Sequence, residues 1–245
     1  QAAFLTPSGP ILYQENGATR SMPRTLAPAQ KPAAVWGVLS DGRVVATLKQ
    51  ESGPAAEDGS EASKHPGDNA GPLVLLSQDG TVDETLITSD VLRAFLSPGR
   101  DAIAAIMPER RLLLWKASQS DGNPLTAAQV DGRVSHASWS PDGRRVAAAV
   151  YPPDFSPEAV TRARNNDEFL RLQNSEIYLI DAATGTVLSR LTNNPGTDIA
   201  PFFSPDGSQL YYLWLHEREN QSGLMRLTLD RDNGTSASAP AVQLT

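Results

Sequence analysis

The sequence predicts an all-β protein, a β-propeller of four-stranded antiparallel blades, and two observations carry this prediction. Residues 174–215 alternate apolar and polar positions and are interrupted by Ala-Thr-Gly and Pro-Asp-Gly turns, a pattern typical of short strands joined by tight turns. The same apolar–turn–apolar unit recurs along the chain, with turn glycines at positions 9, 42, 99, 143 and 207. Without two evident insertions, the repeat shrinks to about 40 residues, the period of a propeller blade.

Five blades are recognisable within one predicted domain, covering approximately residues 1–30, 31–88, 89–131, 132–192 and 193–245. The fourth blade is regular, with strands expected at 134–140, 145–151, 176–181 and 186–192. The first blade is the least regular, because its last two strands are compressed into 18–27. Five blades either close the ring by themselves or form part of a ring of six or more blades.

Two insertions lengthen the second and fourth repeats. Residues 51–70 are acidic and rich in Gly, Ser, Ala and Pro, which is the composition of a mobile loop. Residues 152–173 contain Ser156-Pro157-Glu158, a helix N-cap, a first-position proline and a first-turn acid, and so predict a short helix.

In each blade the four strands are called A to D in chain order. B–C loops and D–A connections emerge on one face of an antiparallel meander.

The B–C loops at 51–70, 152–173 and 216–223 are therefore expected to decorate the same face, beside the mouth of the central channel. Loops on a rigid scaffold commonly carry binding sites. The alternative is that these loops are merely tolerated, because loop length costs little free energy.

Composition and motifs exclude several classes of protein. The formal net charge of −7 argues against a nucleic-acid-binding surface, and no apolar run approaches the roughly 18–20 residues of a membrane span. The chain has no cysteine, so disulfides and cysteine-ligated zinc are excluded, although this fits an exported bacterial protein and a cytosolic one equally. G-x-S-x-G, H-E-x-x-H and phosphate-binding glycine motifs are absent, so we expect no catalytic residue, metal or cofactor.

Candidate binding residues lie near the first strands of the blades and in the loops of the insertion face. At Asp198 a turn-capping role is the more ordinary interpretation, and the surroundings of His216 can equally be an exposed loop. His136 can equally be a solvated rim residue. The candidates are Arg93, Arg133, His136, Asn165, Asn166, Asp198, His216 and Arg218.

Four aromatic residues occupy comparable positions in the first strands of the blades. They could line a channel for a sugar or peptide, but the general burial of aromatic side chains favours packing between adjacent blades. These residues are Trp36, Phe95, Trp139 and Phe203.

Four segments resemble the TolB-type, WD40-like β-propeller repeat: SPDG at 140–143 and 204–207, IYLID at 177–181 and RLTNN at 190–194. The match is close over the fourth and fifth blades and loose over the second and third. The resemblance implies a propeller of a kind often exported in Gram-negative bacteria, where such propellers mostly bind proteins or serve as gates.

We therefore expect a non-catalytic scaffold of the bacterial cell envelope, periplasmic or otherwise exported. Its expected partner is a protein or peptide, with no nucleic acid and no direct membrane insertion. Two other functions stay open. One is a propeller that gates or orients a peptidase-like catalytic domain outside this sequence, and the other is a carbohydrate-binding propeller.

Overall fold

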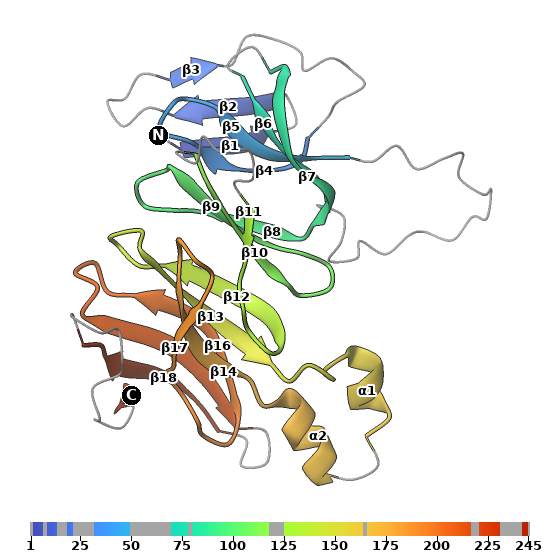
Figure 1. The fold of residues 1–245 in the computed structure, drawn as a ribbon, viewed down its shortest axis with the longest axis vertical. Coiled ribbons are helices and arrows are strands. Elements are labelled where there is room, and N and C mark those ends of the chain that lie inside the picture. The colour runs from blue at the N-terminus through green and yellow to red at the C-terminus, as the bar shows by residue number, and fades with distance from the viewer. Residues whose placement is uncertain are drawn as a thin grey trace, which may run out of the picture. The chain divides into compact units, whose positions relative to one another are not determined.

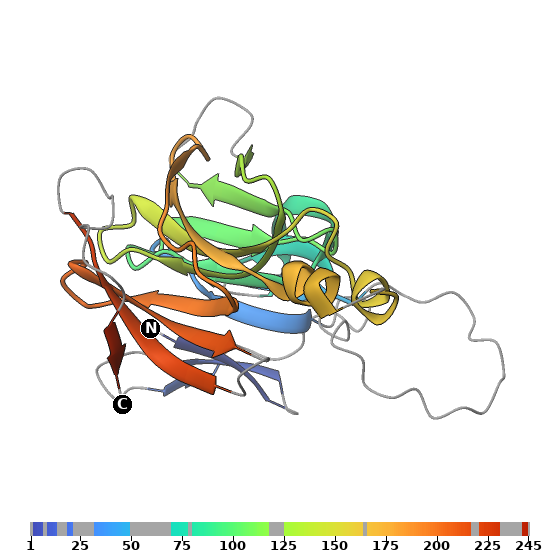
Figure 2. The ribbon, with the colours of Figure 1, turned by 90° about the horizontal axis from the view of Figure 1, so that it is seen from below.

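The computed structural model describes residues 2–6, 9–13, 19–21, 32–49, 70–77, 80–117, 125–163, 166–216, 221–230 and 242–244. Within these ranges the protein is built from antiparallel strands and one helical insertion (Figure 1). The chain divides into two compact units, residues 1–96 and residues 97–245. The insertion belongs to the second unit, where its two helices stand together beyond the strands (Figure 2).

The first unit contains a three-stranded sheet of order β1-β2-β3, a four-stranded sheet of order β4-β5-β6-β7, and strand β8. The strands are β1 (Ala2–Thr6), β2 (Gly9–Tyr13), β3 (Thr19–Ser21), β4 (Pro32–Val38), β5 (Val44–Leu48), β6 (Gly71–Leu76), β7 (Val82–Val91) and β8 (Arg93–Leu96).

The second unit contains two complete four-stranded sheets, β12-β13-β14-β15 and β16-β17-β18-β19, and three strands of a sheet ordered β11-β10-β9-β8. These elements are β9 (Ala102–Ile106), β10 (Leu112–Lys116), β11 (Leu125–Ala127), β12 (Arg133–Trp139), β13 (Arg145–Tyr151), α1 (Pro157–Thr161), α2 (Asn166–Gln173), β14 (Glu176–Asp181), β15 (Val187–Arg190), β16 (Thr197–Phe203), β17 (Gln209–His216), β18 (Gln221–Thr228) and β19 (Val242–Leu244).

The antiparallel sheets follow one another along the chain, as the repeat predicts. Four of them have four strands, and the first has three strands among the described residues. Strand β9 and the middle of β13 are completely buried and rich in alanine.

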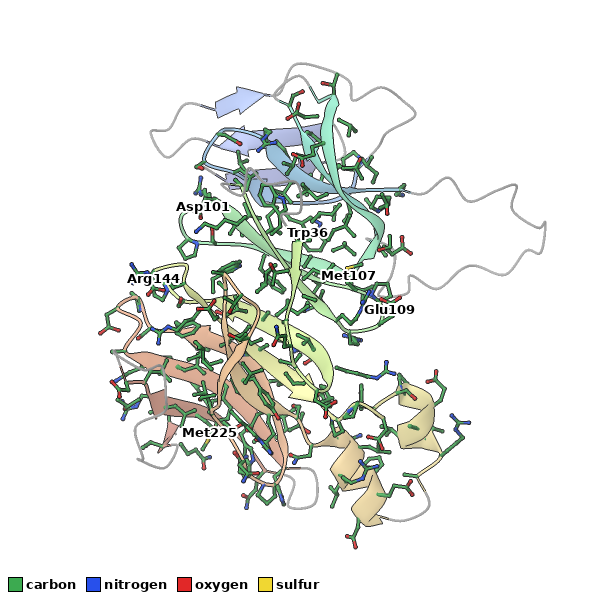
Figure 3. All side chains as sticks on the ribbon, viewed as in Figure 1. Trp36, Asp101, Met107, Glu109, Arg144 and Met225 are labelled. Atoms are coloured by element: carbon green, nitrogen blue, oxygen red, sulfur yellow. The ribbon has the colours of Figure 1, made fainter. Side chains whose placement is uncertain are left out.

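A hydrophobic cluster joins the two complete sheets of the second unit. Ala147 and Ala149 of β13 and Ile177 of β14 pack with Leu210 and Tyr212 of β17. Burying one large aliphatic side chain contributes roughly 1.5–3 kcal/mol to folding. The small side chains on β13 leave room for the larger ones on β17. Met225 of β18 packs on the edge of this cluster (Figure 3).

A serine hydroxyl fixes the A–B turn of several blades. In the fifth blade, Ser204 Oγ accepts a hydrogen bond from the backbone N–H of Gln209 at 2.9 Å and donates to Asp206 Oδ1 at 2.6 Å. In the fourth blade, Ser140 Oγ accepts from the N–H of Arg145 at 2.9 Å. The neighbouring Arg144 marks this hairpin in Figure 3. The sequence predicts that proline, aspartate and glycine form this turn, and the structure shows that the serine side chain also stabilises it.

The third blade has the same turn with different residues. Ser97 Oγ accepts from the N–H of Ala102 at 3.0 Å and donates to Asp101 Oδ1 at 2.9 Å (Figure 3). Arg100 has a φ of 56° and occupies the place that glycine takes in the SPDG turns. This left-handed conformation costs a non-glycine residue roughly 1–2 kcal/mol.

The insertion forms two short helices where one helical excursion was predicted. Ser156 caps α1 by accepting a hydrogen bond from the N–H of Ala159 at 3.0 Å, and Pro157 occupies the first helical position, so the predicted N-terminus is confirmed. The ring of Phe155 stacks on Tyr151 with 4.3 Å between centroids. None of the helices in the described ranges is long and apolar enough to cross a membrane.

The predicted loop at 216–223 is wrong at both ends. Strand β17 continues through His216 and β18 begins at Gln221, because these two residues still pair in the ladder. Residues 217–220 lie outside the described residues, as do residues 51–69 of the first insertion.

Candidate functional site

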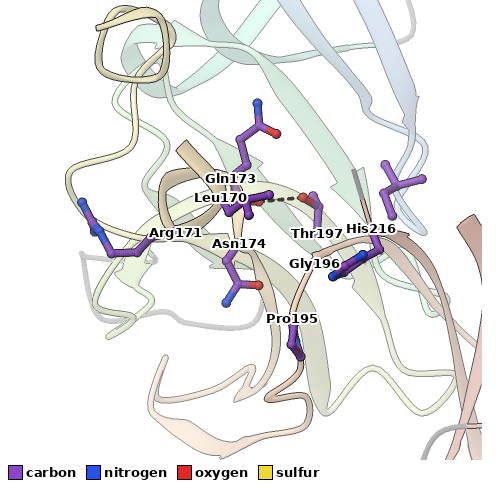
Figure 4. A pocket seen from close by; sticks show the side chains of 9 residues that line it. Leu170, Arg171, Gln173, Asn174, Pro195, Gly196, Thr197 and His216 are labelled. Carbon is purple, nitrogen blue, oxygen red and sulfur yellow. Dashed lines mark hydrogen bonds between the residues drawn. The ribbon is translucent and has the colours of Figure 1, made fainter. Parts of the chain in front are cut away.

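A pocket lies where the helical insertion meets the connection that leads into β16. Its volume is about 290 Å³. Its walls are the end of α2 and the residues after it, residues 195–197, and the end of β17 (Figure 4). The insertion is a B–C loop and residues 195–196 belong to a D–A connection, so the prediction that both kinds of connection share one face is confirmed at this place. The lining residues are Leu170, Arg171, Gln173, Asn174, Pro195, Gly196, Thr197, Leu215 and His216.

Hydrogen bonds between the segments hold these walls in place. Thr197 Oγ1 donates to the backbone carbonyl of Gln173 at 2.7 Å (Figure 4). Trp214 Nε1 donates to the carbonyl of Pro195 at 2.9 Å, and Ser175 forms an isolated parallel bridge with Thr197. The pocket is therefore pre-formed, as small-ligand and anchor sites usually are.

Gly196 allows the pocket wall to approach β17 closely. Its φ is +117°, and a Cβ atom would lie 2.6 Å from the carbonyl oxygen of Leu215 and 2.7 Å from Trp214 Nε1. The indole of Trp214 also stacks on the ring of His216, with centroids 5.6 Å apart. A side chain at position 196 would displace backbone, indole or both.

A buried polar cluster adjoins this wall. Glu176 is only 4% exposed, and its carboxylate accepts hydrogen bonds from Thr192 Oγ1 at 2.7 Å, Arg190 Nη2 at 2.9 Å and Asn174 Nδ2 at 3.3 Å. The Thr192 hydroxyl in turn accepts from the backbone N–H of Ile177 at 2.9 Å. A buried carboxylate needs this degree of pairing, because an unpaired one is strongly destabilising.

Asp198 is the second carboxyl group of the cluster, and it is completely buried. Its Oδ1 accepts from Asn194 Nδ2 at 3.3 Å, whereas its Oδ2 has no hydrogen-bond partner among the described residues. Burial, assisted by the negative charge of Glu176 and opposed by Thr192 and Asn194, raises the pKa of Asp198 to about 7. Burial and the same two carboxyl groups raise the pKa of Tyr212.

The structure brings two predicted candidates to this site. His216 lines the pocket, and Asp198 lies in the cluster beside it. The turn-capping interpretation of Asp198 is wrong, because the residue lies inside β16 and its carboxyl accepts from the side chain of Asn194.

The other predicted candidates lie elsewhere. Arg133 Nε donates to the carbonyl of Pro153 at 3.0 Å and so ties β12 to the insertion. His136 Nδ1 is hydrogen-bonded to Ser135 Oγ at 3.1 Å. Arg93 is exposed on β8 in the first unit. Asn166 begins α2, while Asn165 and Arg218 lie outside the described residues.

In the second unit, the burial of the aromatic residues of the A strands favours a packing role for them. Trp139 is 8% exposed, and Phe203 packs against the hydrophobic cluster, so the interpretation that they fill space between sheets is confirmed there. Trp36 and Phe95 are half-buried in the first unit. Within the described residues, no three His, Asp or Glu side chains are grouped so that they could hold a metal ion.

Sequence reasoning missed Glu176 and Thr192, the centre of the polar cluster. A signal was present: Glu176 opens an otherwise apolar strand, and Thr192 and Asn194 form a polar run four to six residues before Asp198. That run lies in the RLTNN segment, which also carries the resemblance to the repeat.

Two curated relatives match less than half of the chain. It is 27% identical over 136 residues to the Tol-Pal system protein TolB of Bordetella pertussis, covering 45% of this chain and 31% of TolB. It is 29% identical over 108 residues to dipeptidyl-peptidase 5 of Porphyromonas endodontalis, covering 43% of this chain and 16% of that protein. The chain thus spans less than a third of the length of these relatives. No family model matches.

Two solved structures share the fold. Hydrazine synthase from Kuenenia stuttgartiensis aligns with a TM-score of 0.51 at 11% identity, covering 87% of this chain and 54% of its own. The β-propeller domain of Cps50 (Swd1) from Myceliophteria thermophila aligns with a TM-score of 0.50 at 14% identity, covering 82% of this chain and 55% of its own. At such identities the likeness concerns the fold alone.

Successive antiparallel four-stranded sheets and the likeness to a propeller domain define a β-propeller protein. The repeats themselves are of the TolB type, in the SPDG turns and in the sequence relationship to TolB. The fold is therefore that of a β-propeller, and the sequence is similar to propeller proteins with TolB-type repeats.

Proposed function

We propose that this protein is a non-catalytic scaffold that binds a protein or peptide partner on the face of the helical insertion. The observation that supports the proposal best is the pocket at the end of α2, whose walls come from loops and are tied to rigid strands. Loops held on a rigid scaffold are the usual location of binding residues.

The pocket has the size and surface of an anchor for one large apolar side chain. Its volume of about 290 Å³ is near the lower limit of the roughly 300–1,000 Å³ found for small-molecule sites. Leu170, Pro195 and Leu215 supply apolar surface, while Gln173 and Asn174 supply amide groups. A buried anchor of this kind contributes much of the affinity of a protein interface.

Site-specific photocrosslinking tests this proposal. Leu170, in the pocket, is replaced by a benzophenone amino acid, and Leu188, which is 42% exposed on β15, receives the same replacement as a matched control. Irradiation in an envelope extract should give a discrete protein adduct from position 170 and none of that size from position 188. Gly196→Ala, which displaces the pocket wall, should abolish the adduct. Identical adducts from both positions, or none from position 170, would contradict the proposal.

A second candidate function has its own supporting observation. The similarity to dipeptidyl-peptidase 5 covers 43% of this chain, which supports a propeller that accompanies a catalytic domain in a longer protein. A fluorophosphonate probe for active-site serines, applied to the full-length gene product, distinguishes the two. Labelling of the full-length product favours the peptidase arrangement, and labelling absent under conditions that label a known serine peptidase favours the scaffold.

An exported, periplasmic location completes the proposal. It is supported by the TolB-type repeats and by the similarity to a Tol-Pal system protein. Fractionation of the source cells, with a periplasmic and a cytosolic marker enzyme, tests it directly.

A further inference from the structure

We propose that Asp198 is a neutral, buried carboxylic acid in the folded protein, and that its ionisation loosens the adjoining pocket wall. Asp198 would thereby act as a proton-dependent latch on the pocket. This inference goes beyond the proposed function and does not depend on it, because all its readouts concern the protein alone.

The hydrogen bonds of Thr192 give the first argument. A threonine hydroxyl has one proton to donate and two lone pairs to accept with. Its proton goes to Glu176 Oε2 at 2.7 Å, and one lone pair accepts the N–H of Ile177 at 2.9 Å. In this arrangement the hydroxyl donates to Glu176 and leaves Asp198 Oδ2 without a hydrogen-bond partner among the described residues. An ionised carboxylate buried in this way is unfavourable, whereas the protonated acid carries no charge to be compensated.

The surrounding charges give the second argument. The charged group that acts on Asp198 is Glu176 of β14, and Asp198 in turn acts on the titratable Tyr212 of β17. Glu176 is already ion-paired with Arg190 of β15 at 2.9 Å, and the neighbouring strand β12 carries His136, bonded to Ser135. An ionised Asp198 would add a second buried negative charge beside Glu176, whereas a protonated one provides a donor at Oδ2, which otherwise has no partner. Desolvation and a neighbouring carboxylate both favour the neutral form.

Asn194 connects this carboxyl group to the pocket. Its Nδ2 is shared between Asp198 Oδ1 at 3.3 Å and the carbonyl of Pro195 at 3.5 Å, and both bonds are long. Pro195 lines the pocket, and its carbonyl also accepts from Trp214 Nε1 at 2.9 Å. A negative charge on Asp198 would draw the Asn194 amide away from Pro195 and so shift the wall that Trp214 holds.

Nuclear magnetic resonance can follow both ends of this connection. The carboxyl carbon of Asp198 and the indole N–H of Trp214, assigned with Trp214→Phe, are recorded from about pH 5 to about pH 9. Both should titrate with one shared midpoint near 7, because burial raises the pKa of Asp198 to about 7. Asp198→Asn should abolish the indole shift, and Asp131→Asn, at an exposed position, should leave it unchanged.

Each other outcome overturns the inference. A carboxyl midpoint below about pH 5, where an ordinary aspartate titrates, would mean that Asp198 is ionised at neutral pH. A carboxyl midpoint near 7 with an unchanged Trp214 indole signal would mean that ionisation of Asp198 does not affect the pocket wall. If Asp198→Asn fails to fold, Glu176→Gln replaces it: removal of the neighbouring negative charge should lower both midpoints together, and an unchanged midpoint would contradict the charge argument.

Discussion

Replacing Thr192 by valine removes one hydroxyl from the centre of the polar cluster while keeping nearly the same side-chain shape. Thr192 is 5% exposed, so water cannot easily take the place of the lost group. The N–H of Ile177 loses its acceptor, which costs about 1–3 kcal/mol, and Glu176 loses a bond to its charged carboxylate, worth about 1.5–3 kcal/mol. Glu176 keeps Arg190 and Asn174, so the lower ends of these ranges apply, and their sum is about 2.5 kcal/mol.

Urea unfolding followed by tryptophan fluorescence measures this loss. Three of the four tryptophans, Trp115, Trp139 and Trp214, lie in the second unit. With an m value of about 3 kcal/mol per M, the midpoint of Thr192→Val should fall by about 0.8 M. Thr228→Val, exposed on β18, is the matched control and should change stability by less than about 0.5 kcal/mol.

Thr192→Ser keeps the hydroxyl and should retain most of the stability. If Thr192→Val unfolds within about 0.5 kcal/mol of the Thr228→Val control, the cluster does not support the sheet and the reasoning is refuted.

Four further predictions use the same unfolding assay. Ser204→Ala leaves the N–H of Gln209 without its acceptor and should cost about 1–3 kcal/mol; a loss no larger than that of Thr228→Val would contradict the turn mechanism. Replacing Arg110, whose φ is 62°, by glycine should raise the unfolding free energy by about 1 kcal/mol, because glycine adopts this conformation without strain. A loss of stability would show that the backbone at Arg110 is not strained. Gly196→Ala should destabilise the second unit by about 2 kcal/mol or more, because its Cβ meets Leu215 and Trp214. The pKa of Asp198 is raised from 3.8 to about 7 in the folded state, so its contribution is full below about pH 4 and lost as pH rises through about 7. The unfolding free energy of the wild type relative to Asp198→Asn should thus fall by up to about 4 kcal/mol across that range, and a flat difference would refute the shift.

Inner strands were predictable from the sequence, and outer strands less so. Residues 145–151 and 176–181 form strands with the predicted ends, because a tight turn or a clear change of composition marks each boundary. The outermost strands pair on one side only, so hydrophobic alternation constrains them weakly. Strand β15 covers only Val187–Arg190 within the predicted 186–192, while β7 extends over Val82–Val91, past residue 88, where the second blade was predicted to end.

The sequence predicts which face of the protein carries the site, but it does not predict the buried polar cluster beside the pocket. Strand topology alone indicates that B–C loops and D–A connections meet, and the pocket confirms it. The hydrogen bond between Glu176 and Thr192 joins residues sixteen positions apart, so the polar residues can be read from the sequence, but their contact cannot. Burial of Asp198 likewise follows from the packing of β16 in the second unit, whereas the sequence places an ordinary aspartate before an SPDG turn.

Strands β13 and β14 pair directly at Val150 and Glu176, so the two ends of the helical insertion are held side by side by the sheet itself. The free energy of closing such a loop grows only slowly with its length. We therefore expect the β13–β14 ladder to keep its pairing when the insertion between these two strands is replaced by one of different length or composition. If partners bind at the insertion as proposed, a change of partner requires a change in this one segment only.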